Sequence, residues 1–266
     1  MASALVPMQL QGVIMKFPVT FPLTAVAVLV SALVLALPTQ AGMDGARGAR
    51  IPSAHHSPTH AGQSDAAARS EGSQGAWRGR SHAEWAQSFW RWTLSIPFNA
   101  NPAIAGGDCE VNQEGPVWFL VGPLGGSFSR TCTVPVGKAI LAPVAVFLSD
   151  YPCPSPPAFE PAPGQTFADF LGGGLIPLIE SYSVVEARLN GRSLKPRRIT
   201  TRTFGFTAAA DLKAVDGCLT GSPQVGLSDG FFVTIEPLPR GDHILQLRSV
   251  SGILGMTEGT FTLKVK

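Results

Sequence analysis

Five side chains of this 266-residue sequence stand out for the chemistry they could perform. Ser228 is the centre of Gly-Leu-Ser-Asp-Gly, which matches the G-x-S-x-G pattern of α/β-hydrolases. Glu236, Asp242 and His243 lie close together in the sequence, and such a group could perform acid–base catalysis or hold a metal ion. Arg130 interrupts an apolar pattern, and its guanidinium could clamp a carboxylate or a phosphate. These are the residues that a secreted hydrolase or lyase, acting on a polymer or ester, would use.

Each of these candidates also has a purely structural interpretation. The serine of an α/β-hydrolase lies on a sharp turn from a strand into a helix, whereas Phe-Phe-Val-Thr-Ile follows Gly230 and predicts a strand. Adjacent side chains of a strand point to opposite faces, which disfavours Asp242 and His243 as an acid–base pair. We therefore expect the serine motif to be a turn between strands. We expect Glu236, Asp242 and His243 to be exposed loop residues.

Arg130 shares one face of a predicted strand with Phe128, Cys132 and Val134. An unpaired buried charge destabilises a fold by several kcal/mol, so the guanidinium needs a partner. That partner is either a bound anion, which would make Arg130 functional, or an acidic residue of the protein. A third possibility is an arginine stem that reaches solvent at a sheet edge. We favour the structural alternatives.

The elements that would position these residues are mostly strands. Gly115–Lys138 predicts two strands, 117–121 and 127–134, joined by a Pro-Leu-Gly-Gly turn as a central hairpin. About eight short segments with strand patterns follow each other, separated by turns. The chain shows no alternation of strands and helices. The pattern predicts a mainly β fold: an antiparallel β-sandwich of immunoglobulin-like or jelly-roll type, with one N-terminal amphipathic helix.

The predicted N-terminal helix begins after Ser81, where Ser-His-Ala-Glu has the form of a capping box. Trp85, Phe89, Trp92 and Ile96 then lie on one helical face. This face could be an aromatic platform for a sugar or lipid. We favour a helix that packs across the sandwich. A second, short helix could open at 166–169 and end at the three glycines 172–174.

The chain divides into three parts. Residues 1–41 read as a secretory signal peptide, because Lys16 precedes fifteen uncharged residues, Leu23–Leu37, and a small-x-small site ends at Ala41. Met15 is the better start of this peptide, and an uncleaved membrane anchor is the alternative. Residues 42–80 read as a disordered linker poor in large apolar residues. Its histidines 55, 56 and 60 belong to that linker more readily than to a metal site. Residues 81–266 form the folded β-sandwich domain.

Four cysteines, all beyond the predicted cleavage site, indicate disulfides in an exported protein that is secreted or periplasmic. Sequence alone leaves three pairings open. We adopt Cys109–Cys132 and Cys153–Cys218 as the expectation. In the loop-entropy model these bonds would stabilise the fold by about 3 and about 4 kcal/mol.

The net charge and the absence of known motifs indicate which partners and cofactors the chain is not expected to bind. A formal charge of +2 provides no electrostatic footprint for nucleic acid. The sequence contains no P-loop, HExxH, EF-hand loop or CxxC pair, so we expect no cofactor and no metal ion. A membrane is expected only through the N-terminal segment, if that segment is not cleaved. The expected partner is an unidentified ligand outside the cytoplasm.

Several sequence blocks carry a family resemblance. These are Gly-Pro-Val-Trp-Phe-Leu-Val-Gly from Gly115, the glycine pair at 125–126, R-x-C-x-V-P-x-G-K from Arg130, and Pro-Leu-Pro-Arg-Gly-Asp-His-Ile-Leu-Gln-Leu from Pro237. With them the chain resembles a family of uncharacterised exported bacterial proteins over residues 81–266. The resemblance implies an exported single domain and assigns no catalytic residue. We therefore expect a binding or accessory domain, with the hydrolase or lyase as the rival.

Overall fold

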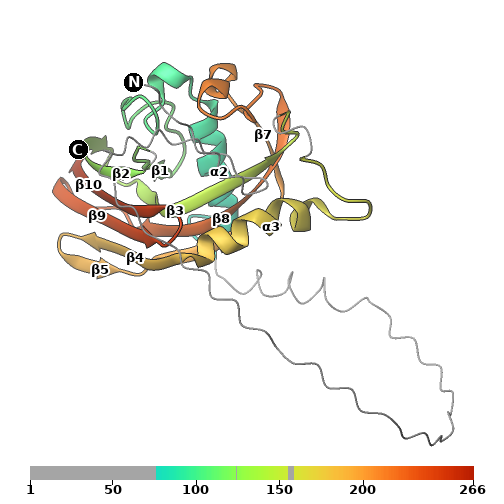
Figure 1. Ribbon diagram of the computed structural model, residues 1–266. Coiled ribbons are helices and arrows are strands. Elements are labelled where there is room, and N and C mark those ends of the chain that lie inside the picture. Colours follow the sequence, from blue (N-terminus) through green and yellow to red (C-terminus); the bar gives the residue numbers. More distant parts are fainter. Residues whose placement is uncertain (1–75, 124, 155–158) are drawn as a thin grey trace, which may run out of the picture. The chain divides into compact units, whose positions relative to one another are not determined.

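The computed structural model describes residues 76–123, 125–154 and 159–266, which form two five-stranded sheets (Figure 1). Sheet 1 has the order β1–β3–β8–β6, with β7 also paired to β8. Its strands are β1 (Val117–Phe119), β3 (Ala139–Tyr151), β6 (Arg197–Thr200), β7 (Phe204–Thr207) and β8 (Pro223–Ile235). Sheet 2 has the order β2–β10–β9–β4–β5. Its strands are β2 (Gly126–Val134), β4 (Tyr182–Leu189), β5 (Arg192–Leu194), β9 (Gly241–Ser251) and β10 (Gly255–Val265). The mainly β, sandwich-like fold is confirmed.

Part of the sequence-based expectation lies outside the described residues. This applies to the signal peptide 1–41 with its alternative start at Met15, to the histidines 55, 56 and 60, and to the linker up to residue 75. The described chain joins the fold before residue 81. Trp77 and Arg80 exchange two backbone hydrogen bonds, of 2.9 and 3.2 Å, and the Trp85 indole donates to the Trp77 carbonyl.

Two strand pairs are parallel, which corrects the expectation of a wholly antiparallel sandwich. β1 runs parallel to β3, and β2 runs parallel to β10. β1 and β2 therefore lie in different sheets, and the predicted hairpin at Gly115–Lys138 does not form. Their burial explains the separation. β1 is buried on both faces, whereas β2 alternates and suits a sheet with one wet face.

Three apolar cores hold the layers together. The first lies between the sheets and includes Leu120, Leu245 and Phe261. The second lies on the other face of sheet 1, beneath helix α2 (His82–Ser95). The third lies beneath helix α3 (Phe167–Glu180), against β3 and β8. Figure 1 shows α2 crossing one side of sheet 1 and α3 running beside β8.

Helix α2 begins with the capping box that the sequence predicts. The Glu84 backbone N–H donates to the Ser81 hydroxyl, and the Ser81 N–H donates to the Glu84 carboxylate. Trp85, Phe89 and Trp92 are at most 7% exposed, and they pack against sheet 1. At about 25 cal/mol per Å² of buried apolar surface, this face stabilises the fold. It is not available as an aromatic platform.

Helix α3 continues where the sequence predicts its end. The three glycines 172–174 lie inside it, and the helix runs on to Glu180. Leu171, Leu175 and Leu178 remain buried at helical spacing against β3 and β8. Such packing supplies most of the stability of helices in proteins, and it outweighs the poor helix propensity of glycine.

The expected disulfide pairing is confirmed. Cys109–Cys132 joins the segment before β1 to strand β2, with Cα atoms 5.5 Å apart. Cys153–Cys218 joins the segment after β3 to the segment before β8, with Cα atoms 4.4 Å apart. Disulfides form and persist in oxidising compartments, so they are consistent with a stabilised extracytoplasmic domain.

Candidate functional site

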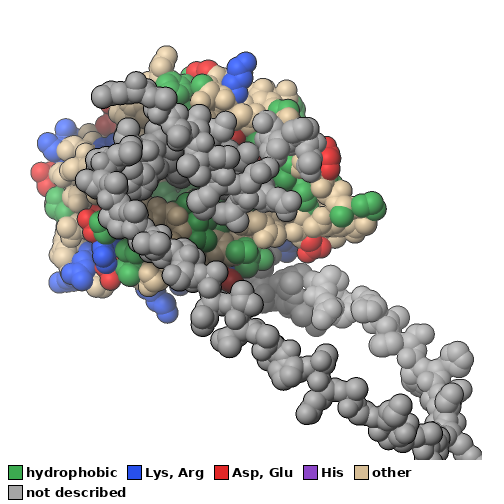
Figure 2. All heavy atoms as spheres, viewed as in Figure 1, with side chains coloured by type: hydrophobic (Ala, Val, Ile, Leu, Met, Phe, Trp, Pro, Cys, Tyr) green, Lys and Arg blue, Asp and Glu red, His purple; other side chains and the backbone are tan. Residues whose placement is uncertain are grey.

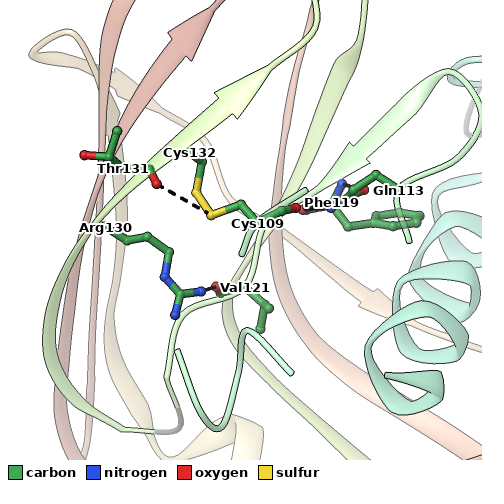
Figure 3. The surroundings of a disulfide bond; sticks show 7 residues. All are labelled: Cys109, Gln113, Phe119, Val121, Arg130, Thr131 and Cys132. Carbon is green, nitrogen blue, oxygen red and sulfur yellow. Dashed lines mark hydrogen bonds between the residues drawn. A yellow bond between two sulfur atoms is a disulfide. The ribbon is translucent and has the colours of Figure 1, made fainter. Parts of the chain in front are cut away.

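Arg130 joins the two sheets where their edge strands meet. Its strand β2 is at the end of sheet 2, and its side chain points inward beside Cys132 (Figure 3). The guanidinium Nη1 donates to the backbone carbonyl of Val121, 3.0 Å away, in the segment after β1. Burial lowers the pKa of Arg130, and the nearby Asp108 acts in the opposite direction. An inward charge on an edge strand also opposes the addition of a further strand. The arrangement matches the sheet-edge alternative.

Ser228 lies inside strand β8 and not on a turn, which corrects the expectation for the G-x-S-x-G motif. Its side chain is 0% exposed on the α2 side of sheet 1. The Trp90 indole donates to the Ser228 hydroxyl over 2.6 Å. The Ser228 backbone N–H donates to the hydroxyl of Thr201 over 2.9 Å. Because Ser228 lies inside a strand, it is not on the strained turn that a hydrolase nucleophile needs. Because its hydroxyl is buried beneath α2, a substrate has no open approach to it.

Glu236 and Asp242 are exposed, and each lies in a different setting. The Glu236 carboxylate accepts the Trp77 indole N–H at 2.8 Å and forms an ion pair with Arg78. Asp242 lies on the outer face of sheet 2, opposite Lys264 of β10. In both positions the carboxylate faces solvent.

His243 is buried at 9% exposure, which corrects the expectation of a loop residue. Its Nδ1 atom lies 2.9 Å from the Asn190 side-chain amide, and its Nε2 atom lies 2.9 Å from the Pro239 carbonyl. A neutral ring that accepts at Nδ1 and donates at Nε2 satisfies both contacts. This imidazole therefore links the β4–β5 turn to the segment before β9. Among the described residues, no hydrogen bond or ion pair connects any two of the five candidates.

A different group of polar residues lies together on the outer face of sheet 2. The register places four residues in one row across the sheet, Ser127–Glu258–Arg248–Glu186. The next row is Ser129–Thr260–Gln246–Arg188. The surface is hollowed here by about 470 Å³, and we call this concavity the sheet 2 hollow. Its polar lining residues are Ser127, Glu186, Arg188, Gln246, Arg248, Glu258 and Thr260.

Arg248 is the centre of the hollow. Its Nε atom donates to Glu258 at 3.0 Å, and its Nη1 atom lies 3.8 Å from Glu186. The guanidinium and the two carboxylates are thus held in a row, and each keeps hydrogen-bonding sites free for a ligand. Figure 2 shows acidic and basic side chains close together on the side where Figure 1 labels β4, β5 and β9. The charges within the hollow nearly balance.

Sequence reasoning did not identify this site because its residues come from four separate strands. Alternation did place Glu186 and Arg188 on a wet face. Nothing in the sequence states that β10 pairs with both β2 and β9, and only that register aligns Glu258 with Arg248. A wet face could be predicted, but not which wet residues are neighbours.

Two further polar clusters are buried and have mainly internal partners. Asp229 is 1% exposed, and it accepts hydrogen bonds from Arg198 and Thr200. Asp150 accepts from the Gln224 amide at 2.7 Å. Burial raises the pKa of Asp150 to about 7, and the Asp216 carboxylate acts in the same direction. Both clusters hold strands and loops together.

The comparisons with known proteins leave the site to be judged on its own geometry. No family model, no curated protein and no solved structure matches the chain. In the described segments, no helix has the length and apolar character needed to cross a membrane. No group of three or more histidine, cysteine or acidic side chains among the described residues could hold a metal ion.

Proposed function

We propose that the chain is an exported binding domain, secreted or periplasmic, whose ligand lies in the sheet 2 hollow. The observation that carries this proposal is the row Glu258–Arg248–Glu186, held by contacts of 3.0 and 3.8 Å on an open, hollowed face. Binding sites combine concavity with a few fixed polar groups, and this face has both. The two disulfides suit a domain that works outside the cytoplasm.

The ligand that suits the hollow is uncharged and rich in hydroxyl groups, such as a polysaccharide. Carboxylates accept hydrogen bonds, a guanidinium donates them, and the amide of Gln246 does both. Neighbouring hydroxyls of a sugar need donors and acceptors at short intervals, which the alternating rows supply. Two arginines face two glutamates here, so a strongly charged ligand would meet like charges.

The rival proposal, a hydrolase or lyase, would need several of the five sequence candidates at one pocket. Ser228 is sealed beneath α2, and the imidazole nitrogens of His243 contact Asn190 and Pro239. Arg130 bonds to a backbone carbonyl. These separate surroundings favour the binding domain over the enzyme.

The experiment is a binding panel of neutral and charged polysaccharides with the wild-type chain and two variants. Arg248→Met removes the central guanidinium and leaves the sheet backbone unchanged. Lys264→Met is the matched control, because it removes an exposed positive charge from the same face outside the hollow. We expect a neutral glycan to bind wild type and the control equally, and Arg248→Met about tenfold more weakly. Equal binding by both variants would refute the assignment.

A further inference from the structure

The turn between β4 and β5 is attached to β9 through the side chain of Asn190. This residue follows β4 with a φ of 49°, so the regular β4–β9 ladder ends at the pair Leu189–Leu245. The Asn190 backbone N–H still donates to the Ile244 carbonyl, and the Asn190 side-chain oxygen accepts the Ile244 N–H, both at 2.8 Å. The carboxamide therefore takes the place of a backbone carbonyl and extends the pairing by one residue.

The imidazole of His243 fixes the orientation of this carboxamide. The Asn190 side-chain nitrogen lies 2.9 Å from Nδ1 of His243. An amide NH₂ group can only donate, so Nδ1 must accept and must carry no proton. On the other side of the ring, Nε2 lies 2.9 Å from the Pro239 carbonyl, which can only accept, so Nε2 must carry the proton. One protonation state satisfies both contacts, and it is neutral.

A second proton on the ring is incompatible with these contacts. The imidazolium donates at both nitrogens, and its Nδ1–H would face the NH₂ group of Asn190. Turning the carboxamide over would bring its oxygen to the ring, but it would also place the NH₂ group against the Ile244 N–H. In either orientation two donors face each other beside a histidine that is only 9% exposed. A buried donor without an acceptor destabilises the structure, so protonation favours separation of the turn from β9, where water can solvate both groups.

The strands around His243 bring no carboxylate to the ring. The register places Leu263 of β10 opposite it, and sheet 1 contributes the apolar side chains of the first core. Asp242 precedes it on β9 and therefore points to the outer face, where Lys264 lies opposite. Arg192 of β5 is exposed on the inner side of the hairpin, and its positive charge opposes an imidazolium.

The segment that carries Pro239 contains two charged residues, Glu236 and Arg240. Glu236 forms an ion pair with Arg78, and Arg240 is exposed. In the described part of the chain, the imidazole of His243 takes part in no ion pair. An imidazolium at this position therefore gains no compensating salt bridge, and it loses a hydrogen bond.

The contact between Asn190 and His243 lies beside the sheet 2 hollow. Arg188 of β4 and Gln246 of β9 line the hollow and lie opposite each other. Asn190 and Ile244 are the pair two residues further along the same two strands. Only β5 lies beyond β4 in the sheet order, so β9 is the strand that holds the hairpin to the rest of sheet 2 (Figure 1). Release of the turn would therefore loosen the strand that positions Arg188.

We propose that Asn190 and His243 form a proton-operated latch. With a neutral imidazole the latch holds the β4–β5 hairpin on β9, and protonation in mild acid releases the hairpin and weakens ligand binding in the sheet 2 hollow. Histidine is the side chain whose charge ordinarily changes between about pH 5 and about pH 8. The effect on binding rests on the proposed function, whereas the latch itself can be tested without a ligand.

The test compares hydrogen exchange of the Ile244 amide, followed by nuclear magnetic resonance, in the full-length wild type and two variants between about pH 8 and about pH 5.5. His243→Asn keeps an oxygen acceptor for the Asn190 amide but cannot gain a proton. Asn190→Asp offers its carboxylate to both the Ile244 N–H and the imidazolium Nδ1–H, so it closes the latch in acid. We expect protection to fall roughly threefold to tenfold with acid in wild type, to stay constant in His243→Asn, and to rise in Asn190→Asp.

Protection is expressed against the exchange rate of an unstructured amide at the same pH. The Leu247 amide, further along β9, is the reference within each chain, because Asp150 on sheet 1 gains its proton in the same pH range and changes the stability of the whole fold. Equal pH dependence of the Ile244 and Leu247 amides in wild type would overturn the latch. A folded Asn190→Asp chain that shows no reversal would overturn it as well.

The ¹⁵N chemical shifts of the His243 ring in wild type provide a measurement that needs no variant. We expect the Nε2–H tautomer at about pH 8 and a ring protonated at both nitrogens at about pH 5.5. A proton on Nδ1 in the neutral ring, or a ring that remains neutral in acid, overturns the proposal.

A glycan from the polysaccharide panel supplies the last readout. Its affinity should fall in acid for wild type and stay constant for His243→Asn. Equal pH dependence in both chains would contradict the link between the latch and the hollow. A panel without any bound glycan would count against the proposed function, and the exchange measurement would still decide the latch.

Discussion

The outer faces of the two sheets differ: the central strands of sheet 1 are buried on both faces, whereas the strands of sheet 2 keep one face open to solvent. The outer face of sheet 1 is covered by α2, and there even the hydroxyl of Ser228 is consumed by the Trp90 indole. The outer face of sheet 2 carries Glu186, Arg248 and Glu258 around an open hollow. The residue with the best motif lies on the sealed face, and the hollow is lined by residues without one. Burial, more than a motif, decides which residues can meet a ligand.

The largest expected effect tests whether the covered face stabilises the fold. Phe89 is 1% exposed and packs edge-on against Phe119 and Phe232. Phe89→Ala removes this packing, and we expect it to lower the free energy of unfolding by about 3–5 kcal/mol. Urea unfolding followed by tryptophan fluorescence measures it. A loss below about 1 kcal/mol would mean that α2 is only loosely attached.

Asp150, on the covered side of sheet 1, is expected to make the free energy of unfolding depend on pH. Burial raises its pKa from the ordinary 3.8 to about 7 in the folded protein, so folding favours the protonated carboxyl. The stability from that proton is complete below about pH 4 and is lost as the pH rises to about 7. Asp150→Asn stays neutral and can still accept from Gln224. We expect it to be more stable than wild type at pH 8, on the order of 1–3 kcal/mol, and to show no gain at pH 4.

Thermal unfolding of wild type and Asp150→Asn between pH 4 and pH 8 checks this prediction. Converging curves at low pH and diverging curves at high pH are the expected result. Parallel curves over the whole range would show that Asp150 is not held in its neutral form.

The variant Ser228→Ala tests whether Ser228 has a structural or a catalytic role. Ser228→Ala leaves the buried Trp90 indole N–H without its acceptor, and we expect a loss of about 1–3 kcal/mol in unfolding free energy. Labelling with a fluorophosphonate probe supplies the second readout, and we expect wild type to remain unlabelled. Labelling that disappears in Ser228→Ala would reverse our assignment of this face.

The smallest effect on stability is expected in the sheet 2 hollow. Arg248 is only partly buried, and such ion pairs contribute little to stability because solvent screens them. Arg248→Met should therefore change the free energy of unfolding by less than about 1 kcal/mol, while it weakens ligand binding. Urea unfolding provides the check. A loss comparable to that of Phe89→Ala would make Arg248 a structural residue and weaken the comparison.

Much of the fold follows from local patterns. The α2 capping box, the wet face of β2 and the disulfide cysteines are all visible in the sequence. Long-range pairing is not visible in the sequence, because the glycine pair at 125–126 is equally compatible with a hairpin and with a crossing between two sheets. The same limit applies to His243, whose imidazole contacts the side chain of Asn190, a residue far away in the sequence. Local sequence patterns predict the helices and strands, but the strand register and the order of the layers decide which side chains become neighbours.

The most direct test of the binding face is nuclear magnetic resonance. Backbone amide shifts of the ¹⁵N-labelled chain would be followed while a bound glycan from the polysaccharide panel is added. We predict that the perturbed amides cluster on β4, β9 and β10 around Glu186, Arg248 and Glu258, with those of α2 unchanged. Perturbations centred on α2 or around Ser228, with sheet 2 unaffected, would contradict the account.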